Sequence, residues 1–227
     1  MTLEFLSPAP SALARSPMER EALAAGATIE LRDGWNVAVG YDDPEAERQR
    51  CSSAAGFADR SHLGKIEIQA SAGDLARIME LRLGEATRAE NAWWCPYTKE
   101  RALVLCEPAD TAAMLARLEA AIAGCDELAS VTDLTASLAA LTIAGPLAPE
   151  VFARFTAIDL RPQVTPLHGF RPGSVARTPG AILREGEQSW LMLFGAALGR
   201  YVWTVVADAA GSLGGGPVGI DALPSHA

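Results

Sequence analysis

Apolar and polar residues alternate in the same way in two stretches of this chain, which lie about 75 residues apart. The first stretch covers residues 57–69 and the second covers residues 131–143. Each begins with an Asp-x-Ser/Thr triplet, continues through a short gap, and ends in an alternating run of β-branched residues that is typical of a strand. A turn and a helical pattern follow both copies. Self-similarity of this kind predicts a chain built from two related halves.

Helical and strand-like periodicities alternate through the first half. Ser16-Pro17-Met18-Glu19 has the pattern of a capping box at a helix start, and Asp33-Gly34 marks a tight hairpin turn. The charged segment 84–91 is expected to be a loop. The predicted helices cover residues 16–26, 43–55, 73–83 and 111–124, and the predicted strands cover residues 28–32, 36–39, 65–69 and 101–106.

The second half repeats the order of strand, turn and helix. The predicted strands cover residues 137–143, 174–183 and 189–193, the predicted helices cover residues 148–155 and 196–209, and a proline-rich connection covers residues 161–173. Strand-helix-strand units of antiparallel character are therefore present twice. They indicate an α+β fold with two similar lobes of antiparallel sheet and helices, and not a doubly wound parallel sheet.

These patterns divide the chain into four parts. Residues 1–15 are rich in Ser, Pro and Ala, and we expect them to form a flexible arm. The first lobe is expected over residues 16–130 and the second over residues 131–210. The glycine-rich residues 211–227 are expected to form a linker or tail, because the run lacks the Lys-Ser/Thr of a phosphate loop.

The composition is that of a soluble globular protein and argues against several classes of partner. The chain has 227 residues, a net charge of −9 at pH 7 and an isoelectric point near 4.9. Phosphate binding needs clustered Lys and Arg, so we expect no nucleic-acid partner. No apolar run reaches the roughly 20 residues that span a bilayer, and the N-terminus has no signal-peptide pattern. We expect a cytoplasmic protein with no membrane partner.

The cysteines and histidines do not form a metal motif. Cys51, Cys95, Cys106 and Cys125 show neither C-x-x-C nor C-x-x-H spacing, and there are only three histidines, one of them His226 near the end. We expect reduced, structural thiols and no metal site. No strand is followed by Gly-x-Gly-x-x-Gly, so we expect this chain alone to bind no dinucleotide.

Four segments carry a family resemblance. They are Gly34-Trp35 with Tyr41, Phe57-Ala-Asp-Arg-Ser-His-Leu-Gly-Lys-Ile66, Asp133-Leu-Thr with Leu141-Thr-Ile-Ala-Gly-Pro146, and Arg184-Glu-Gly-Glu-Gln-Ser-Trp190. Together they resemble the folate-binding domain of the glycine cleavage T-protein (aminomethyltransferase) family, which includes the γ subunit of heterotetrameric sarcosine oxidase. The second segment is the most specific, and the last is especially close to the γ subunit. The resemblance runs from about residue 16 to residue 223, and it implies the T-protein fold with tetrahydrofolate as cofactor.

The chain departs from the family pattern in three places. Family enzymes have an acidic strand whose Asp assists methylene transfer, but no acidic residue lies between Asn91 and Lys99. The family's Gly-Tyr-Thr-Gly-Glu is shortened to Glu185-Gly186-Glu187. The chain also ends where the family's C-terminal β domain would start. The resemblance therefore implies a folate-binding domain that lacks this β domain.

The resemblance implies that Glu187 binds the cofactor. A carboxylate can accept two hydrogen bonds from the amino-pyrimidinone edge of a pterin, which would fix the orientation of the ring. The alternative is an exposed glutamate in the turn between the strands at 174–183 and 189–193. This alternative is favoured by the composition of residues 185–189, which is that of a solvated turn.

Asp59, Ser61 and His62 are further candidates for cofactor binding, since they belong to the most family-like segment. Asp59 and Ser61 also have an architectural interpretation, in which Asp-x-Ser closes a turn through hydrogen bonds from backbone to side chain. Asp133-Leu-Thr135 occupies the equivalent place in the second half, which favours the architectural interpretation. His62 has no counterpart there.

Aromatic residues stand where family enzymes have the acidic strand. Trp94 and Tyr97, with Trp93 beside them, could stack on a flat heterocycle, fill a subunit interface or plug the core. The sequence leaves these three alternatives open.

Two functions agree with these patterns, and no catalytic residue is assigned for either. In the first, the chain is a γ-like subunit of a heteromeric sarcosine oxidase or a related amine-demethylating complex in tetrahydrofolate-linked one-carbon metabolism, with larger flavin-containing subunits as partners. In the second, it is a stand-alone tetrahydrofolate-dependent aminomethyltransferase or demethylase, in which Asp59, Glu187 or Glu100 would supply a carboxylate. A role in iron–sulfur cluster maintenance ranks last, since no cysteine lies in that family's Lys-Gly-Cys-Tyr context.

Overall fold

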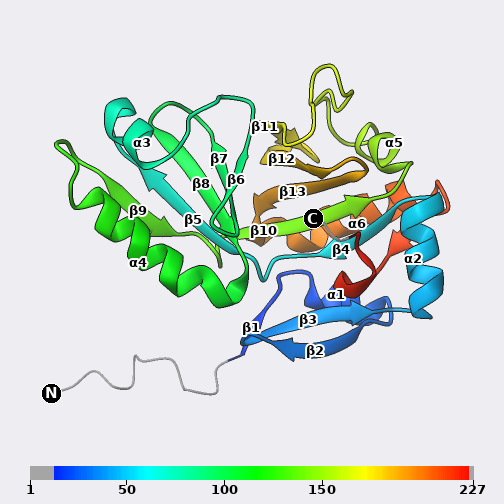
Figure 1. Cartoon of the computed structure of the whole chain (residues 1–227). Coiled ribbons are helices and arrows are strands. Elements are labelled where there is room, and N and C mark those ends of the chain that lie inside the picture. Colours follow the sequence, from blue (N-terminus) through cyan, green and yellow to red (C-terminus); the bar gives the residue numbers. More distant parts are fainter. Residues whose placement is uncertain (1–12, 225–227) are drawn as a thin grey trace, which may run out of the picture.

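The computed structural model describes residues 13–224, which form three β-sheets with helices packed against them (Figure 1). The small N-terminal sheet has the order β1-β3-β2, with β1 at Ala14–Arg15, β2 at Thr28–Arg32 and β3 at Trp35–Gly40. A six-stranded sheet has the order β11 (Phe170–Val175), β12 (Thr178–Gly186), β13 (Ser189–Gly195), β10 (Leu138–Ala144), β4 (Gly56–Asp59) and β14 (Gly216–Pro217). A five-stranded sheet has the order β6 (Thr87–Ala89), β7 (Ala92–Pro96), β8 (Arg101–Cys106), β5 (Gly64–Gln69) and β9 (Ser130–Asp133).

Six α-helices lie within the described residues. They are α1 (Glu19–Ala24), α2 (Pro44–Ser53), α3 (Ala72–Ile78), α4 (Thr111–Ile122), α5 (Ala148–Phe152) and α6 (Gly199–Gly211). In residues 13–224, no helix is long and apolar enough to cross a membrane. Strand pairing is antiparallel throughout the two larger sheets except between β14 and β4. The predicted α+β fold with two lobes of antiparallel sheet is confirmed.

The two repeated stretches are crossovers between the larger sheets. In the first copy the chain leaves β4 in the six-stranded sheet and enters β5 in the five-stranded sheet. In the second copy it leaves β9 in the five-stranded sheet and enters β10 in the six-stranded sheet. Strands β4 and β10 pair antiparallel, and so do β5 and β9. Each half therefore contributes one strand to the sheet of the other half: β4 joins the six-stranded sheet, and β9 joins the five-stranded sheet. The boundary predicted between residues 130 and 131 consequently lies within β9, which pairs with β5.

The same hydrogen bonds close both crossovers. The Asp59 carboxylate accepts from the Ser61 amide at 2.9 Å, and the Asp133 carboxylate accepts from the Thr135 amide at 2.8 Å. The two hydroxyls reach across to the other copy, since Ser61 Oγ accepts from the amide of Ala140 at 3.2 Å. Thr135 Oγ1 likewise accepts from the Lys65 amide at 3.0 Å. These bonds show that the Asp-x-Ser/Thr triplets have an architectural use.

Several predicted elements are confirmed by local turn and cap chemistry. Asp33 and Gly34 have positive φ angles of 47° and 80°, as the two-residue turn between β2 and β3 requires. Asp43 caps α2, because its carboxylate accepts from the amides of Glu45 and Ala46 at 3.1 and 3.2 Å. The predicted strand at 101–106 and the helix from Thr111 also form.

Other boundaries in the first half were wrong. The first helix begins at Glu19, not at Ser16, because the Ser16 hydroxyl donates to the Asp59 carboxylate and ties the chain to the first crossover. The helix predicted over 73–83 ends at Ile78, where the backbone becomes extended. The predicted loop 84–91 contains β6, since Glu90 and Asn91 adopt positive φ angles of 54° and 58° and turn the chain into β7.

Boundaries in the second half differ for similar reasons. The strand predicted over 174–183 is interrupted by a tight turn at Ala176 and Arg177, with φ angles of 47° and 61°, which joins β11 to β12. The predicted proline-rich connection therefore ends at Gly169. Helix α5 ends at Phe152, earlier than predicted, and α6 begins at Gly199 after a 3₁₀ turn over Ala196–Leu198.

The two expected tails pack against the fold where the structure describes them. Residues 1–12 and 225–227 lie outside the described residues, but β1 pairs in parallel with β3. The glycine-rich run contains β14, which adds to β4, and Val218 is fully buried. A Cβ atom at Gly219 would lie 1.8 Å from the Val39 carbonyl oxygen. Glycine is therefore needed here for close backbone approach and not for a flexible linker.

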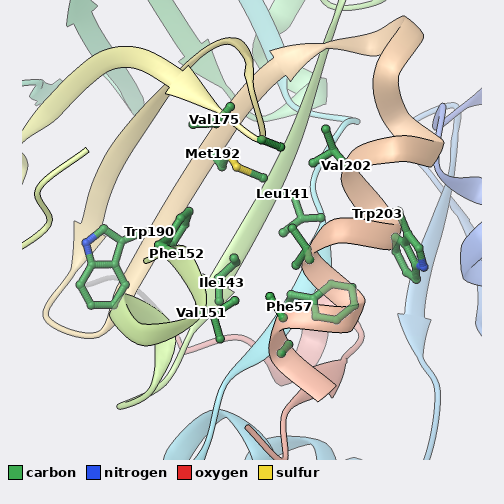
Figure 2. Packing of buried hydrophobic residues seen from close by; sticks show 14 of the residues in the cluster. Phe57, Leu141, Ile143, Val151, Phe152, Val175, Trp190, Met192, Val202 and Trp203 are labelled. Carbon is green, nitrogen blue, oxygen red and sulfur yellow. The ribbon is translucent and has the colours of Figure 1, made fainter. Parts of the chain in front are cut away.

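Strand alternation divides the apolar side chains among three main cores. One lies on the outer face of the six-stranded sheet, and Figure 2 shows its side chains gathered between the strands and helices α5 and α6. A second lies on the outer face of the five-stranded sheet, where α3 and α4 contribute Leu75 and Leu118. The third fills the space between the two larger sheets. Neighbouring residues separate accordingly: Trp93 and Leu191 point between the sheets, whereas Trp94 and Trp190 point outward.

Candidate functional site

A cavity of about 300 Å³ opens beside the core that lies between the two larger sheets. The turn of the first crossover supplies Arg60 and His62, β7 supplies Trp93, and β12 supplies Glu185. The site is therefore built where the first repeat passes from one sheet to the other. Polar and aromatic groups converge on it from elements that are far apart in sequence.

Arg60 and Glu185 form the main charged contact of this cavity. Arg60 Nη1 donates to both carboxylate oxygens of Glu185, at 3.0 and 3.2 Å, and Thr142 Oγ1 donates to the same carboxylate at 3.3 Å. Glu185 is buried, so its charge requires these partners. Arg60 also reaches Glu107 at 3.5 Å. The buried carboxylate is thus already engaged within the protein.

His62 faces this cavity as a neutral imidazole. Burial lowers the pKa of His62 to about 3, and the positive charges of Arg60 and Lys65 lower it further. A neutral imidazole has one donor and one acceptor nitrogen. At neutral pH His62 can therefore exchange single hydrogen bonds with a ligand but cannot bind an anion as a cation.

Lys65 is fully buried beneath the crossover, a placement that sequence reasoning missed. Its ammonium group donates to the carbonyl oxygens of Ser61 at 2.8 Å, Leu63 at 2.6 Å and Thr135 at 3.3 Å. Burial lowers the pKa of Lys65 to about 8, although the nearby Asp59 and Asp133 carboxylates act in the opposite direction. Three carbonyls match the three ammonium donors, so Lys65 ties the two crossovers together. The signal that could have indicated this burial is the position of Lys65, a charged residue inside an alternating β-branched strand.

The predicted site residues do not come together in one cavity, and only His62 among them lines the cavity beside Arg60. Asp59 and Ser61 are buried in the crossover turn, and burial raises the pKa of Asp59. Glu187 lies in the turn between β12 and β13, where its side chain is 80% exposed and accepts from Arg184 at 3.2 Å. The exposed-turn alternative describes Glu187 correctly, and the carboxylate at the cavity is Glu185, two residues earlier. An irregularity in the pairing between Arg184 and Gly186 displaces the register there.

The aromatic residues of β7 also separate. Trp94 packs on the outer face of its sheet, where its indole Nε1 donates to the Ala89 carbonyl at 3.3 Å. Trp93 lines the cavity and contacts the His168 ring edge to face, with centroids 4.9 Å apart. Tyr97 contacts Phe170 at 5.1 Å, and burial raises its pKa to about 12. The core alternative describes Trp94, and the cavity alternative describes Trp93. Ligand contact by Glu187, Asp59, Ser61, His62, Trp94 and Tyr97 remains a prediction.

The space between the sheets does not fit a pteridine ring. Twelve buried side chains fill it, among them Leu183, Leu191 and Leu193. The cavity beside it lies at the lower end of the roughly 300–1,000 Å³ that is typical of small-molecule sites. Its buried carboxylate is occupied by Arg60, so no reaction step through a bound folate follows from these residues. Within residues 13–224, no group of three or more His, Cys, Asp or Glu side chains could hold a metal ion.

Comparison with known proteins gives the family by sequence and the fold by structure. The model of the GCVT N-terminal domain matches residues 92–226. The aminomethyltransferase of Desulfitobacterium hafniense (strain Y51) is 24% identical over 230 residues, covering 92% of this chain and 62% of the relative. This chain thus spans about three fifths of that relative's length.

Two solved structures share the fold. The glycine cleavage system aminomethyltransferase T from Bartonella henselae aligns with a TM-score of 0.75 at 19% identity, covering 92% of this chain and 60% of that one. A chain of the heterotetrameric sarcosine oxidase from Corynebacterium sp. U-96 aligns with a TM-score of 0.68 at 19% identity, covering 94% of this chain and 99% of that one. The resemblance inferred from the four sequence segments is confirmed, and because the family model matches more than half of its residues, this chain belongs to the GCVT N-terminal domain family.

Proposed function

We propose that this chain is a γ-like subunit of a heteromeric sarcosine oxidase or a related amine-demethylating complex in the cytoplasm. Its partners are larger flavin-containing subunits, and the flavin chemistry and most of the folate chemistry of the complex take place on those chains. The observation that carries this proposal is the apolar core between the two larger sheets. A cavity between the lobes would favour a ligand-binding enzyme, whereas a packed core favours a scaffold.

The composition of that core supports a structural role. Leu183 and Leu191 are fully buried in it, and Leu193 is 1% exposed. Opening this space for a cofactor would expose apolar surface and leave large side chains without packing partners, at a cost of about 25 cal/mol for each Å² exposed. The apolar side chains that fill this space therefore stabilise the fold.

The missing acid also supports the proposal. Transfer of a one-carbon unit between nitrogen atoms needs a group that moves a proton near the reacting nitrogen. The strand β7 offers Trp93, Trp94 and Cys95 in place of a carboxylate. Glu185 is the buried carboxylate at the cavity, and both of its oxygens already accept hydrogen bonds from the guanidinium of Arg60.

The shared fold is the third support. The alignment with a chain of heterotetrameric sarcosine oxidase covers almost the whole of both chains. This agrees with the close match of Gly186-Glu-Gln-Ser-Trp190 to the γ subunit. A subunit whose partners carry out the chemistry does not need an open space between its sheets, so a subunit role also agrees with the packed core of this family member.

Co-purification from the native host tests the proposal. A tag placed on either end of the full chain should bring down larger partner subunits together with flavin absorbance, at physiological expression level. The complex should oxidise an N-methylated amine such as sarcosine, while the isolated chain should not. A chain that elutes alone from both tagged forms at physiological concentration would contradict the subunit role.

The alternative is a stand-alone tetrahydrofolate-dependent aminomethyltransferase or demethylase. It is favoured by His62 and Glu185, which face one cavity from different elements. Calorimetric titration of the isolated chain with tetrahydrofolate separates the two functions. We expect no heat of binding up to millimolar concentration. Binding that is lost in Glu185→Gln and kept in Glu187→Gln, with both variants folded, would replace the subunit proposal by this alternative.

A further inference from the structure

Apolar side chains form part of the lining of the 300 Å³ cavity that contains His62. They come from the first crossover, from β8 and from the segment that follows β14, and they are Leu63, Leu105, Ile220 and Leu223. The segment after β14 is held in place, because Val218 is fully buried and the Gly219 amide donates to the buried carboxylate of Glu47 at 2.6 Å. This part of the lining is therefore a fixed surface that suits an aliphatic group.

The polar part of the lining contains a loose ion pair. Arg60 Nη2 lies 3.5 Å from a carboxylate oxygen of Glu107, whose side chain is 60% exposed. This distance is longer than that of a charge-assisted hydrogen bond. Within residues 13–224, neither Nη2 nor Nε of Arg60 makes a hydrogen bond, and the Glu107 carboxylate accepts none. One positive and one negative group of this cavity therefore keep hydrogen-bonding capacity for a ligand.

The free edge of the Arg60 guanidinium is on its exposed side. Nη1 donates to Glu185, whose side chain is only 2% exposed, whereas Nη2 is turned toward the exposed Glu107. Nε and Nη2 together form one edge of a guanidinium, which can bind a carboxylate through two parallel hydrogen bonds. The exposed pair with Glu107 gives way at little cost, because such pairs contribute little to stability. A ligand carboxylate can therefore reach Arg60 without breaking its bond to Glu185.

His62 adds an uncharged acceptor to the same cavity. It is partly buried, and neither of its ring nitrogens has a hydrogen-bond partner in the described part of the chain. Burial lowers the pKa of His62 to about 3, so at neutral pH one of these nitrogens accepts a hydrogen bond. An ammonium group has three donors and can bond both to His62 and to Glu107.

We propose that this cavity binds a free α-amino acid with a branched aliphatic side chain. Its carboxylate accepts from Arg60, its ammonium group donates to Glu107 and His62, and its side chain lies against the apolar part of the lining. In an α-amino acid one carbon atom separates the two charges, which suits protein groups as close together as Arg60 and Glu107. A ligand with a single charge satisfies only one of them. The site goes beyond the subunit role and does not depend on it, since every group belongs to this chain.

Nuclear magnetic resonance of the full ¹⁵N-labelled chain tests the proposal with four matched probes. L-Leucine carries both charges and the side chain, 4-methylpentanoate lacks the ammonium group, 3-methylbutylamine lacks the carboxylate, and L-alanine lacks most of the side chain. We expect L-leucine to shift the assigned amide signals of His62 and Glu107, with a dissociation constant on the order of 1 mM, as suits a ligand of this size. Each of the other three probes should bind about 10-fold more weakly, which is the effect of one charged hydrogen bond or of a few buried methyl groups.

The variant Glu107→Gln tests the ammonium contact. Glu107 is exposed, so the variant should fold, and L-leucine should bind to it about 10-fold more weakly. Binding of 4-methylpentanoate should not weaken, because the variant lacks a charge that repels this anion. Glu119→Gln is the matched control, since this exposed residue of α4 does not line the cavity, and it should leave the binding of both probes unchanged.

Four results would overturn the proposal. They are unmoved His62 and Glu107 signals at 10 mM L-leucine (about 10 times the expected dissociation constant), equal binding of 4-methylpentanoate, unchanged L-leucine binding in Glu107→Gln, and equal weakening in Glu119→Gln. None of them bears on the subunit role, which co-purification tests separately.

Discussion

Asp59 and Asp133 close the same turn in the two halves of the chain, but Asp59 is buried and Asp133 is exposed. Each carboxylate accepts from the amide two residues later. Only Asp59 also accepts from the hydroxyl of Ser16, which precedes the first helix. The repeated motif therefore has one geometry and two different environments.

The two turns should therefore contribute differently to the free energy of unfolding. Asp59→Ala leaves the buried Ser61 amide and the Ser16 hydroxyl without an acceptor, and we expect it to lower the free energy of unfolding by about 2 kcal/mol. Asp133→Ala leaves the Thr135 amide without its acceptor, but water can reach this amide, so the variant should lose less than about 1 kcal/mol of unfolding free energy. Urea denaturation of both variants measures the difference. Equal losses would show that burial does not decide the strength of these turns.

The Arg60–Glu185 pair should behave as a buried ion pair. Glu185→Ala leaves the Arg60 guanidinium without its main countercharge, and we expect a loss of about 3 kcal/mol of unfolding free energy. The double variant Arg60→Met/Glu185→Leu should lose less than the sum of the single variants, since neither charge is then buried alone. Glu187→Ala is the matched control, because this exposed carboxylate should contribute less than about 1 kcal/mol. Additive losses in the double variant would contradict a strong pair.

His62 should make the protein sensitive to acid. Its pKa in the folded chain is about 3, while the unfolded chain has the ordinary value of about 6.5. Below pH 6.5 the unfolded state binds a proton that the folded state does not, so His62 lowers the stability as the pH falls from 6.5 towards 3. Between pH 7 and pH 5 we expect the wild type to lose about 2 kcal/mol more unfolding free energy than His62→Gln. Stability curves that run parallel over this range would contradict a depressed pKa of His62.

The core between the sheets should be sensitive to cavities. Leu191 is fully buried there, and Leu191→Ala should lower the free energy of unfolding by about 3 kcal/mol. Leu31 is 61% exposed on β2, so Leu31→Ala should change the stability by less than about 0.5 kcal/mol. Thermal or chemical unfolding of both variants provides the measurement. A small effect at Leu191 would mean that the space between the lobes can relax or open.

Local chemistry explains which elements were predictable from the sequence. The turn at Asp33-Gly34, the cap at Asp43 and the amphipathic helix from Thr111 depend on residues within one or two turns of chain, and all three form. The turns at Glu90-Asn91 and Ala176-Arg177 were missed. Asn91 tolerates positive φ, but Glu90, Ala176 and Arg177 have no such preference and adopt it within hairpins that the sheets stabilise.

Periodicity and turn chemistry depend on neighbouring residues, so the amino-acid sequence was enough to identify the two related halves, the Asp-x-Ser/Thr turns and the family. The assignment of each strand to a sheet, and with it the burial of Glu185 against Arg60 and the exposure of Glu187, could be seen only in the packed fold. Burial depends on groups that meet from distant parts of the chain, here across 125 positions. Two glutamates separated by a single glycine thus have the same local chemistry, and long-range packing alone gives them different environments.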